Sequence, residues 1–313
     1  MKNKIPYPHD CTVGTCGSCR TKLIEGKVEA ITPFAYTLSK EELESGYILA
    51  CQALAKTDLT LGVDITSAEI KAAKQSATLE VTQDLTHDIK KITWSVEKPV
   101  FWRAGQYVNV HWDGSETHRS YSFATAPSKQ GSHEIVTFMR HVPGGMLTDR
   151  FFKDDTETMN FEIDGPHGNF WLRDGDGPLI CICGGSGLAP ILSLLSDAAN
   201  KMVRRDCILL FGARTRDDLY GREELDAIKS SWTAGFDIWE VLSEEKSDSY
   251  RHGFVTDYVP KALERLGSGA QGYMCGPPPM IDAGIHALNE LGISLDDIHY
   301  DKFTDASTKS DEN

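Results

Sequence analysis

The sequence predicts three domains in chain order: a small cysteine-rich module, an antiparallel β-barrel and a doubly wound α/β domain. Three observations predict them. Three of the eight cysteines stand within nine residues near the start. Short strands with alternating apolar residues then follow, separated by Gly, Pro and Asp, which is typical of a small barrel. In the last part, compact apolar runs alternate with helical stretches, which indicates a parallel sheet. A length of 313 residues allows two or three domains.

The elements of each domain can be placed from these patterns. In the first module we expect strands at KVEAI and LTLGVDI and a short polar helix at SKEELESG. In the barrel we expect the strands LEVTQDL, IKKITWSV, QYVNVHW, EIVTFMR and MNFEI, with one helix at MLTDRFF. The last domain should alternate the strands PLICIC, CILLFG, FDIWEV and QGYMCG with the helices APILSLLSDAANKM, REELDAIKSSW, VTDYVPKALERL and PMIDAGIHALNEL.

Domain boundaries are placed where the pattern changes. The stretch SAEIKAAKQSA is polar and rich in alanine, which is typical of a linker. The ending DASTKSDEN has the composition of a disordered tail. The expected parts are the cysteine module at 1–67, the linker at 68–77, the barrel at 78–174, the α/β domain at 175–304 and the tail at 305–313.

Composition and charge exclude several classes of protein. A hydrophobic content of 40% with 25% charged residues is typical of a globular protein in water. The formal net charge of −14 argues against a nucleic-acid partner and suits a basic protein partner. The start has no apolar stretch for a signal peptide, and glycines and a proline interrupt the most apolar region, so we expect no membrane insertion. We therefore expect a cytoplasmic protein. We also expect it to act as a monomer.

The clustered cysteines predict a metal site. Cys11, Cys16 and Cys19 have the spacing C-x4-C-x2-C, and Cys51 follows at a distance. This is the plant-type ferredoxin spacing, in which four thiolates hold a 2Fe–2S cluster. Glycines in the loop let backbone N–H groups approach sulfur. Structural zinc is the competing interpretation, but its usual pattern is two short C-x2-C pairs.

The stretch around these cysteines, IPYPHDCTVGTCGSCRTKLIEGKVEAI with SGYILACQA, resembles the ferredoxin domain of bacterial multicomponent oxygenase reductases. The resemblance implies a β-grasp module. It departs from that family at its beginning, because a β-hairpin and most of a helix normally precede the first cysteine, whereas ten residues precede Cys11 here. We therefore expect a module without its N-terminal hairpin, an open edge at LTLGVDI, and a natural chain that begins further upstream.

The motif RSYSFATAP suggests a flavin site. On a strand, Arg119 and Tyr121 point to one face, and Ser120 and Ser122 to the other. A guanidinium can hold a phosphate, an aromatic ring can stack on a ligand ring, and a hydroxyl can bond a flavin nitrogen. An ordinary surface strand remains the alternative. Downstream, VPGGMLTDRFF places Gly144, Gly145 and Thr148 at a helix N-terminus that favours a phosphate.

In order along the chain, AGQYVNV, RSYSFATAP, VPGGMLTDRFF and IDGPHGNFWL resemble the ferredoxin–NADP reductase superfamily, whose barrel binds FAD. The resemblance implies that Arg119 contacts the pyrophosphate, Tyr121 the isoalloxazine ring, Ser122 its polar edge and Thr148 a phosphate. FMN remains an alternative, but an N-terminal ferredoxin domain goes with the FAD-binding branch.

The stretch CGGSGLAP follows a strand and opens a helix, although it lacks the fingerprint G-x-G-x-x-G. Its glycines allow a pyrophosphate to approach a helix N-terminus. The same superfamily carries GG[TS]GLAP here and CGPPPM about ninety residues later. The resemblance implies that one group lies along the dinucleotide: Gly184, Gly185, Ser186 and Gly187. It implies that a second group lies near the nicotinamide: Cys275, Gly276, Pro277 and Met280. Cys275 would shape the hydride-transfer site; a buried thiol ending a strand is the alternative.

Two further stretches concern the nucleotide. In FGARTRDDLY, Arg214 and Arg216 could pair with a 2′-phosphate, whereas Asp217 and Asp218 would oppose it. Because similar stretches occur in NADH-using reductases, we expect NADH rather than NADPH. In the final stretch IHYDKF, Phe303 is our candidate for an aromatic ring that covers the flavin until nicotinamide displaces it; a terminal core strand is the alternative.

The parts together predict an electron-transfer protein with FAD, a 2Fe–2S cluster and NADH as cofactors. A flavin can accept two electrons and release them singly, and a cluster at roughly −400 mV can donate them onward. We expect the reductase component of an oxygenase, either Rieske or diiron, with Cys275, Phe303 and Ser122 at the reaction centre. The alternatives are a free-standing NAD(P)H flavin or ferric reductase, and a redox-responsive or zinc-binding module without enzymatic function.

Overall fold

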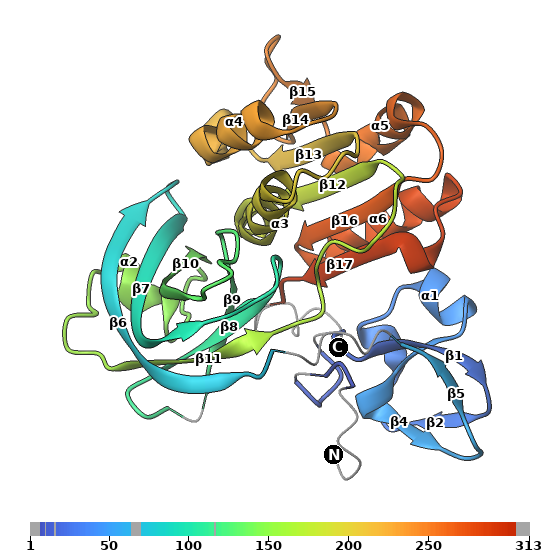
Figure 1. The fold of residues 1–313 in the computed structure, drawn as a ribbon, viewed down its shortest axis with the longest axis horizontal. Coiled ribbons are helices and arrows are strands. Elements are labelled where there is room, and N and C mark those ends of the chain that lie inside the picture. Colours follow the sequence, from blue (N-terminus) through green and yellow to red (C-terminus); the bar gives the residue numbers. More distant parts are fainter. Residues whose placement is uncertain (1–6, 10, 16, 64–69, 116, 305–313) are drawn as a thin grey trace. The chain divides into compact units, whose positions relative to one another are not determined.

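The computed structural model describes residues 7–9, 11–15, 17–63, 70–115 and 117–304. The chain divides into two compact units, the first ending at Lys71 and the second beginning at Ala72 (Figure 1). No helix among the described residues is long and apolar enough to span a membrane.

The first unit is built from two small antiparallel sheets. One has the strand order β3-β1-β5 and the other pairs β2 with β4. Their bounds are β1 Arg20–Glu25, β2 Val28–Ala30, β3 Tyr47–Leu49, β4 Ala53–Ala55 and β5 Thr60–Gly62. The expected strand LTLGVDI is shorter in the structure, where its three residues Thr60–Gly62 form β5. Among the described residues, β5 pairs only with β1.

Helix α1, Lys40–Glu44, begins at a capping box. The Ser39 hydroxyl accepts the Glu42 N–H, and the Glu42 carboxylate accepts the Ser39 N–H at 2.8 Å. The same carboxylate is fully buried and forms an ion pair with Arg20, whose guanidinium lies 4.1 Å from the centre of the Tyr47 ring. A buried charge is tolerated because it is paired, so this ion pair ties α1 to the strand that follows Cys19.

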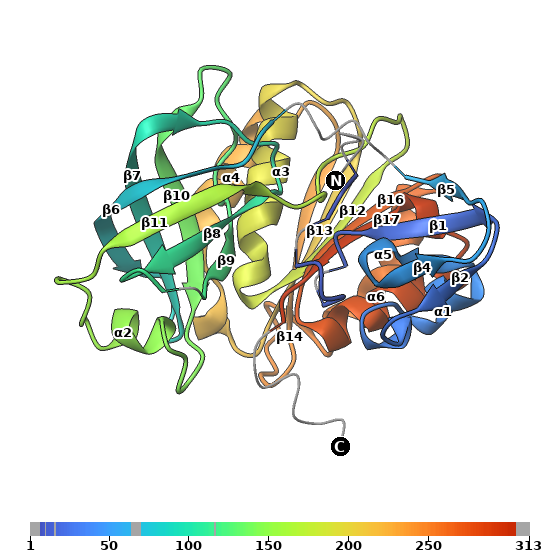
Figure 2. The same cartoon turned by 90° about the horizontal axis from the view of Figure 1, so that it is seen from below.

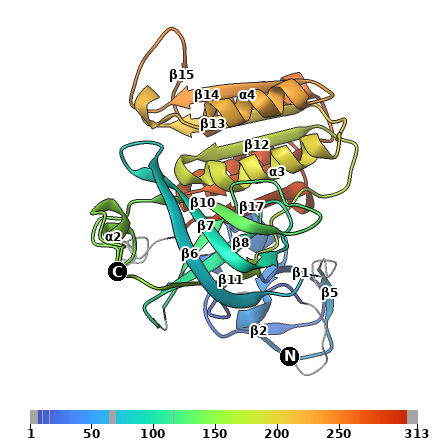
Figure 3. The same cartoon turned by 60° about the vertical axis from the view of Figure 1, so that its left-hand side comes forward.

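The second unit begins with a curled antiparallel sheet of six strands in the order β10-β7-β6-β11-β8-β9 (Figure 3). The strands are β6 Ala73–Asp84, β7 Ile89–Val100, β8 Tyr107–Trp112, β9 Arg119–Ser122, β10 Ser132–Arg140 and β11 Phe161–His167. An antiparallel bridge between Phe123 and Thr137 links the chain just after β9 to β10. The expected helix is α2, Thr148–Phe152. We call this part the antiparallel domain.

The inside of the curl is filled by large side chains. Trp94 is fully buried, and its ring meets those of Phe151 and Phe161 edge-on at 5.9 and 5.1 Å. Its indole N–H donates to the Thr137 hydroxyl at 3.1 Å, so its polar atom is satisfied. The sequence prediction was wrong about where this domain starts, because β6 begins at Ala73, inside the range 68–77 expected as a linker.

The rest of the second unit is a parallel sheet with the order β15-β14-β13-β12-β16-β17. The strands are β12 Leu179–Gly184, β13 Cys207–Ala213, β14 Phe236–Leu242, β15 Arg251–His252, β16 Gln271–Gly276 and β17 Ile298–Lys302. The strand order reverses between β12 and β16, and ligands of such sheets bind at the carboxyl ends of the strands at this switch point.

Helices cover both faces of the sheet, as the sequence predicted (Figure 2). They are α3 Leu188–Asn200, α4 Arg222–Ser231, α5 Val259–Leu266 and α6 Pro278–Glu290. Buried residues Leu179, Cys181 and Leu209 share one apolar core with α3 and α4. On the other face, Gly284 of α6 packs against Met274 of β16. We call this part the nucleotide domain.

The antiparallel and nucleotide domains share one core. Ile89, Val136 and Phe138 of the antiparallel domain lie in the same buried cluster as the residues of α3. The buried hydroxyl of Ser193, on α3, donates to the Thr125 carbonyl at 2.6 Å. These contacts join the two domains within the second unit.

Candidate functional site

The first candidate site is formed by the thiols of the first unit. The sulfur atoms of Cys19 and Cys51 lie 3.2 Å apart, although 32 residues separate them in the chain. The Cys11 sulfur accepts the Thr15 N–H at 3.3 Å. Cys16 lies outside the described residues. Burial, together with the neighbouring Cys51 and Cys11, raises the pKa of the Cys19 thiol to about 12. Thiolates this close repel each other unless a cation holds them, so the donor set fits a thiolate-bound metal group.

The loop that carries these cysteines is held by a residue that sequence reasoning missed. The Gln52 amide donates to the Thr12 carbonyl at 2.9 Å, and its side chain fills the space that a Cβ on Gly14 would need. Gly14 has a φ of +85°, which glycine adopts without strain. The Thr37 hydroxyl donates to the Gly14 carbonyl at 2.5 Å. The sequence signal that could have pointed to Gln52 is its position directly after Cys51.

The second candidate site lies on β9. In the register of β8 and β9, Arg119 pairs with Val110 and Tyr121 with Val108, both of which are core residues. Directly paired residues share a face, so Arg119 and Tyr121 share one face, as predicted. The Arg119 side chain is exposed and its Nη1 donates to the His118 carbonyl at 2.8 Å. Burial raises the pKa of Tyr121, which is half-buried against the core.

The remaining residues of β9 face the other way. The Ser120 hydroxyl donates to the Asn109 side chain at 2.7 Å. Ser122 is buried and pairs with Tyr107. The strand therefore carries an exposed guanidinium, a half-buried phenol ring and a buried hydroxyl within four residues.

The turn before α2 differs from expectation. The Gly144 N–H is not free, because it donates to Asp149 Oδ1 at 3.1 Å. The Thr148 hydroxyl donates to the Val142 carbonyl at 3.0 Å, and a Cβ on Gly145 would press against that hydroxyl at 2.5 Å. Hydrogen bonds from Lys153 and His141, with a smaller contribution from Gly144, lower the pKa of Asp149 to about 2. A carboxylate of the chain therefore already occupies this helix start, and a phosphate role for Gly144, Gly145 and Thr148 stays a prediction.

The third candidate site lies at the switch point of the nucleotide domain. The predicted glycine loop Gly184–Gly187 follows β12, and the predicted CGPPPM stretch ends β16, which lies beside it. A Cβ on Gly187 would collide with the Cys275 carbonyl. A Cβ on Gly276 would lie 2.6 Å from Met280 Cε and 3.4 Å from the Gly184 carbonyl.

The structure thus brings together two motifs that are far apart in the sequence. Glycine is required at Gly187 because it packs directly against the Cys275 backbone, and it is favoured at Gly276 because the φ there is +150°. The two loops lie at the carboxyl ends of β12 and β16, the edge of such a sheet at which dinucleotides bind.

Cys275 is fully buried at this point and pairs in register with Cys183 on β12. Burial, with a smaller contribution from Asp301, raises the pKa of the Cys275 thiol well above its usual range. Burial likewise raises the pKa values of Cys183 and Cys207. A thiol in such surroundings is not a nucleophile.

Phe303 follows β17 and is anchored to the same loop. Its backbone N–H donates to the Gly276 carbonyl at 2.9 Å, and its side chain is half-buried. This hydrogen bond holds Phe303 next to the CGPPPM stretch.

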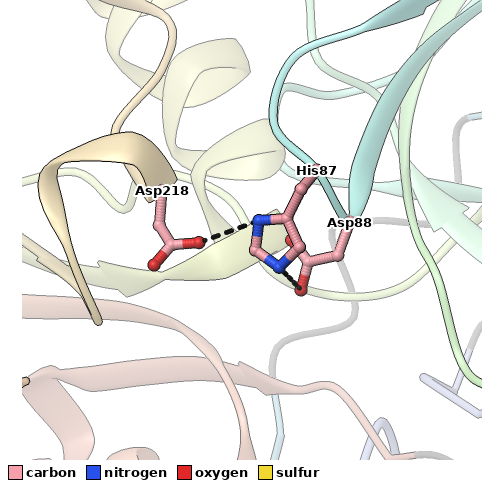
Figure 4. A group of neighbouring side chains, drawn as sticks. All are labelled: His87, Asp88 and Asp218. Carbon is pink, nitrogen blue, oxygen red and sulfur yellow. Dashed lines mark ion pairs between the residues drawn. The ribbon is translucent and has the colours of Figure 1, made fainter.

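A cluster of charged residues joins the two domains of the second unit, and sequence reasoning did not predict it. His87 and Asp88 stand in the turn between β6 and β7, and Asp218 follows β13 (Figure 4). His87 Nδ1 lies 3.4 Å from Asp218 Oδ1. Asp88 Oδ2 accepts from Arg140 Nε at 3.1 Å and from Arg214 Nη2 at 3.2 Å.

The ligand atoms of His87, Asp88 and Asp218 are close enough to hold a metal ion. The two guanidinium groups already neutralise the carboxylates, and a cation would be repelled by them. Burial alone would raise the pKa of Asp88, but Arg140 and the Thr86 hydroxyl outweigh it and lower the pKa. The cluster is therefore an ion-pair network.

Both arginines considered for the 2′ position of the nucleotide are already paired. Arg214 lies within 3.4 Å of Asp218 as well as near Asp88. Arg216 Nε donates to Glu245 Oε1 at 2.7 Å, and its backbone N–H donates to Oε2 at 2.9 Å.

Family models match the three parts of the chain. Residues 1–56 match a 2Fe-2S iron-sulfur cluster binding domain, residues 76–171 an oxidoreductase FAD-binding domain, and residues 181–284 an oxidoreductase NAD-binding domain. These matches and the sites above define an oxidoreductase that combines an iron–sulfur, a flavin and a nicotinamide nucleotide domain.

Curated relatives make the family more specific. The chain is 36% identical to the xylene/toluene monooxygenase electron transfer component XylA of Pseudomonas putida, over 96% of this chain and 85% of the relative. It is 34% identical to the reductase subunit of an aromatic O-demethylase of Amycolatopsis, over 98% and 93%. The chain therefore belongs to the family of electron-transfer reductase components of oxygenase systems.

Two solved structures of reductases are similar to this chain. The crystal structure of the Amycolatopsis cytochrome P450 reductase GcoB superposes with a TM-score of 0.75 at 33% identity, covering 96% of this chain and 91% of that one. The ferredoxin reductase in carbazole 1,9a-dioxygenase superposes with a TM-score of 0.71 at 27% identity, with the same coverage.

Proposed function

We propose that the protein takes electrons from NADH and delivers them singly, through FAD and a 2Fe–2S cluster, to an oxygenase component. One observation carries this proposal: the glycine loop after β12 and the CGPPPM stretch after β16 meet at the switch point, with Phe303 bonded to the second of them. When bound, the flavin lets a two-electron donor feed a one-electron carrier, and the cluster passes single electrons on.

At the nucleotide end, the chain's own residues bind and orient. The residues Gly184, Gly185, Ser186 and Gly187 would lie along the pyrophosphate, where small side chains leave room and helix N–H groups can donate hydrogen bonds to it. Gly276, Pro277 and Met280 would shape the nicotinamide pocket, with the buried Cys275 beneath it. A further candidate is Arg140, whose Nη1 lies 3.7 Å from the place of a Gly185 Cβ and could bind the same pyrophosphate.

At the flavin end, Arg119 would bind the pyrophosphate, Tyr121 would pack on the isoalloxazine ring, and Ser122 would bond its polar edge. The exposed guanidinium and half-buried ring on one face support these roles. Thr148 would contact a phosphate only after releasing the Val142 carbonyl. Phe303 would cover the ring until nicotinamide displaces it.

In the first unit, Cys11, Cys16, Cys19 and Cys51 would hold the cluster. The close approach of Cys19 and Cys51 supports this ligand set. The Thr15 N–H bonded to the Cys11 sulfur is the kind of donor that stabilises a thiolate ligand.

NADH is favoured over NADPH by the charge at the edge of the sheet. Arg214 and Arg216, which could have bound a 2′-phosphate, are held by Asp218, Asp88 and Glu245. A 2′-phosphate would have to displace these carboxylates and would meet their negative charge.

The partner is an oxygenase component, and we infer a monomeric reductase because the proposed sites are made by one chain. We expected a Rieske or diiron oxygenase. The relatives widen this choice, since one solved structure is named a cytochrome P450 reductase.

An anaerobic titration tests the function. The purified protein should show flavin and 2Fe–2S absorption, contain two irons and two acid-labile sulfides per chain, and bleach with NADH faster than with NADPH. Flavin absorption without iron would support a free-standing flavin or ferric reductase. A colourless protein with bound zinc would support a non-enzymatic module.

A further inference from the structure

One carboxylate of the antiparallel domain joins two arginines that come from different domains. Arg140 stands at the end of β10 in the antiparallel domain, and Arg214 follows β13 in the nucleotide domain. Both donate to the same oxygen, Asp88 Oδ2, at 3.1 and 3.2 Å. Without this carboxylate the two guanidinium groups would repel each other at short range.

The turn that carries Asp88 is itself well held. The Thr86 hydroxyl donates to Asp88 Oδ1 at 3.0 Å, and the Asp88 carbonyl accepts the His141 N–H at 2.8 Å. The Asp88 side chain is 17% exposed, so its ion pairs are less screened than those on the open surface.

The network reaches the predicted pyrophosphate loop. Arg140 Nη1 lies 3.7 Å from the place of a Gly185 Cβ. The Tyr220 hydroxyl donates to the Gly185 carbonyl at 2.8 Å, and the Tyr220 ring meets that of Phe138, on β10, edge-on at 5.5 Å. The end of β10 therefore lies beside the glycine loop, with the Arg140 guanidinium next to Gly185 and bonded to Asp88.

We propose that Asp88 is a positioning residue for hydride transfer from the nucleotide to the flavin. By binding Arg140 and Arg214 together, it holds the glycine loop of the nucleotide domain at a fixed place relative to the antiparallel domain. This inference rests on the proposed function. Displacing donor and acceptor by about 1 Å can cost about a hundredfold in rate, so a residue that sets this distance has a large effect without touching either one.

The first test measures flavin bleaching in an anaerobic stopped-flow instrument after mixing with saturating NADH. Asp88→Asn should keep its flavin and iron, and its bleaching rate constant should fall by about tenfold or more. The shape-conserving change removes the charge alone. Asp88→Glu should recover part of the rate.

Glu240→Gln is the matched control. It breaks another carboxylate–guanidinium pair, in which Arg222 Nη2 donates to Glu240 at 2.8 and 3.1 Å within the nucleotide domain. This variant should bleach at the wild-type rate. A wild-type rate in Asp88→Asn, or an equal loss in Glu240→Gln, would overturn the proposal.

A second readout needs neither nucleotide nor turnover. Hydrogen exchange of the oxidised protein should show faster exchange at residues 184–187 in Asp88→Asn than in the wild type, and no change in Glu240→Gln. A variant that merely lowers the melting temperature, with unchanged exchange in this loop, would refute the positioning role. If the wild type itself fails to bleach with NADH, the proposed function is wrong. The exchange experiment still tests whether Asp88 holds the glycine loop in place.

Discussion

The backbone N–H of Phe303 donates to the carbonyl of Gly276 at 2.9 Å, so the end of the last strand is fixed to the loop that ends β16. This bond places the expected flavin-covering residue beside the expected nicotinamide pocket. If the ring blocks the pocket, nicotinamide must displace it before reduction can occur.

Phe303→Ala should therefore lower the half-saturating concentration of NADH severalfold, because no ring has to be displaced. The half-saturating concentration is measured from the steady-state rate of ferricyanide reduction at varied NADH concentrations. Phe303→Tyr is the control and should behave as the wild type, since it keeps the aromatic ring. Equal half-saturation in all three proteins would show that the ring does not cover the pocket.

Gly187→Ala tests the contact between the two loops at the switch point. The added Cβ would collide with the Cys275 carbonyl, and overpacking of this kind costs roughly 1–3 kcal/mol of unfolding free energy. We expect a lower denaturation midpoint and weaker NADH binding. Gly62→Ala is a suitable control because its Cβ would meet ordinary contacts at 3.4 Å or more. The idea is wrong if both variants melt alike.

Cys51→Ser should remove the cluster and with it electron transfer to a one-electron protein acceptor. Reduction of cytochrome c should be lost, whereas reduction of ferricyanide, which the flavin can perform directly, should persist. Iron and sulfide content should fall together. Cys207→Ala is the matched control, because this buried thiol lies in the apolar core of the nucleotide domain. Retained cytochrome c reduction in Cys51→Ser would falsify the ligand assignment.

Arg119→Ala should weaken flavin retention, since the exposed guanidinium is the group expected to hold the pyrophosphate. The ratio of flavin to protein after gel filtration measures it. The control is Arg265→Ala, which removes another exposed arginine, one paired with Asp237. A full flavin complement in Arg119→Ala would contradict the assignment.

Glu245→Gln should shift the nucleotide preference toward NADPH. Hydrogen bonds to Arg216 keep the pKa of Glu245 below its usual range, so the carboxylate is charged at neutral pH and opposes a 2′-phosphate. Removing this charge takes away the repulsion of a 2′-phosphate, so the ratio of kcat/KM for NADPH over NADH should rise by about a few-fold. Glu240→Gln should leave the ratio unchanged; if both variants shift it equally, the effect is one of general charge.

The candidate site residues could be proposed from the sequence because their signals are local. The spacing of Cys11 and Cys19 and the run from Gly184 to Gly187 lie within a few residues, and a short loop can present them to one ligand. Patterns of strand and helix also placed the parallel sheet correctly. The boundary at Ala73 was missed, because most side chains of β6 are exposed and polar, so its sequence resembles a linker although the strand pairs with β7 and β11.

Gln52 and Asp88 could not be assigned roles in the same way. Gln52 acts on residues 40 positions away, and Asp88 meets Arg140 and Arg214 at separations of 52 and 126 residues. Polar residues of this kind are common on surfaces, and their partners exist only after the strands have packed.

The sequence by itself determined the order of the three domains, the thiol set and the two glycine-containing loops, because each depends on residues close together along the chain. The tertiary structure decided that these loops meet, that Gly144 is already bonded, and that a carboxylate joins two domains. Those facts depend on which strand ends become neighbours, and that is set by packing of the whole sheet.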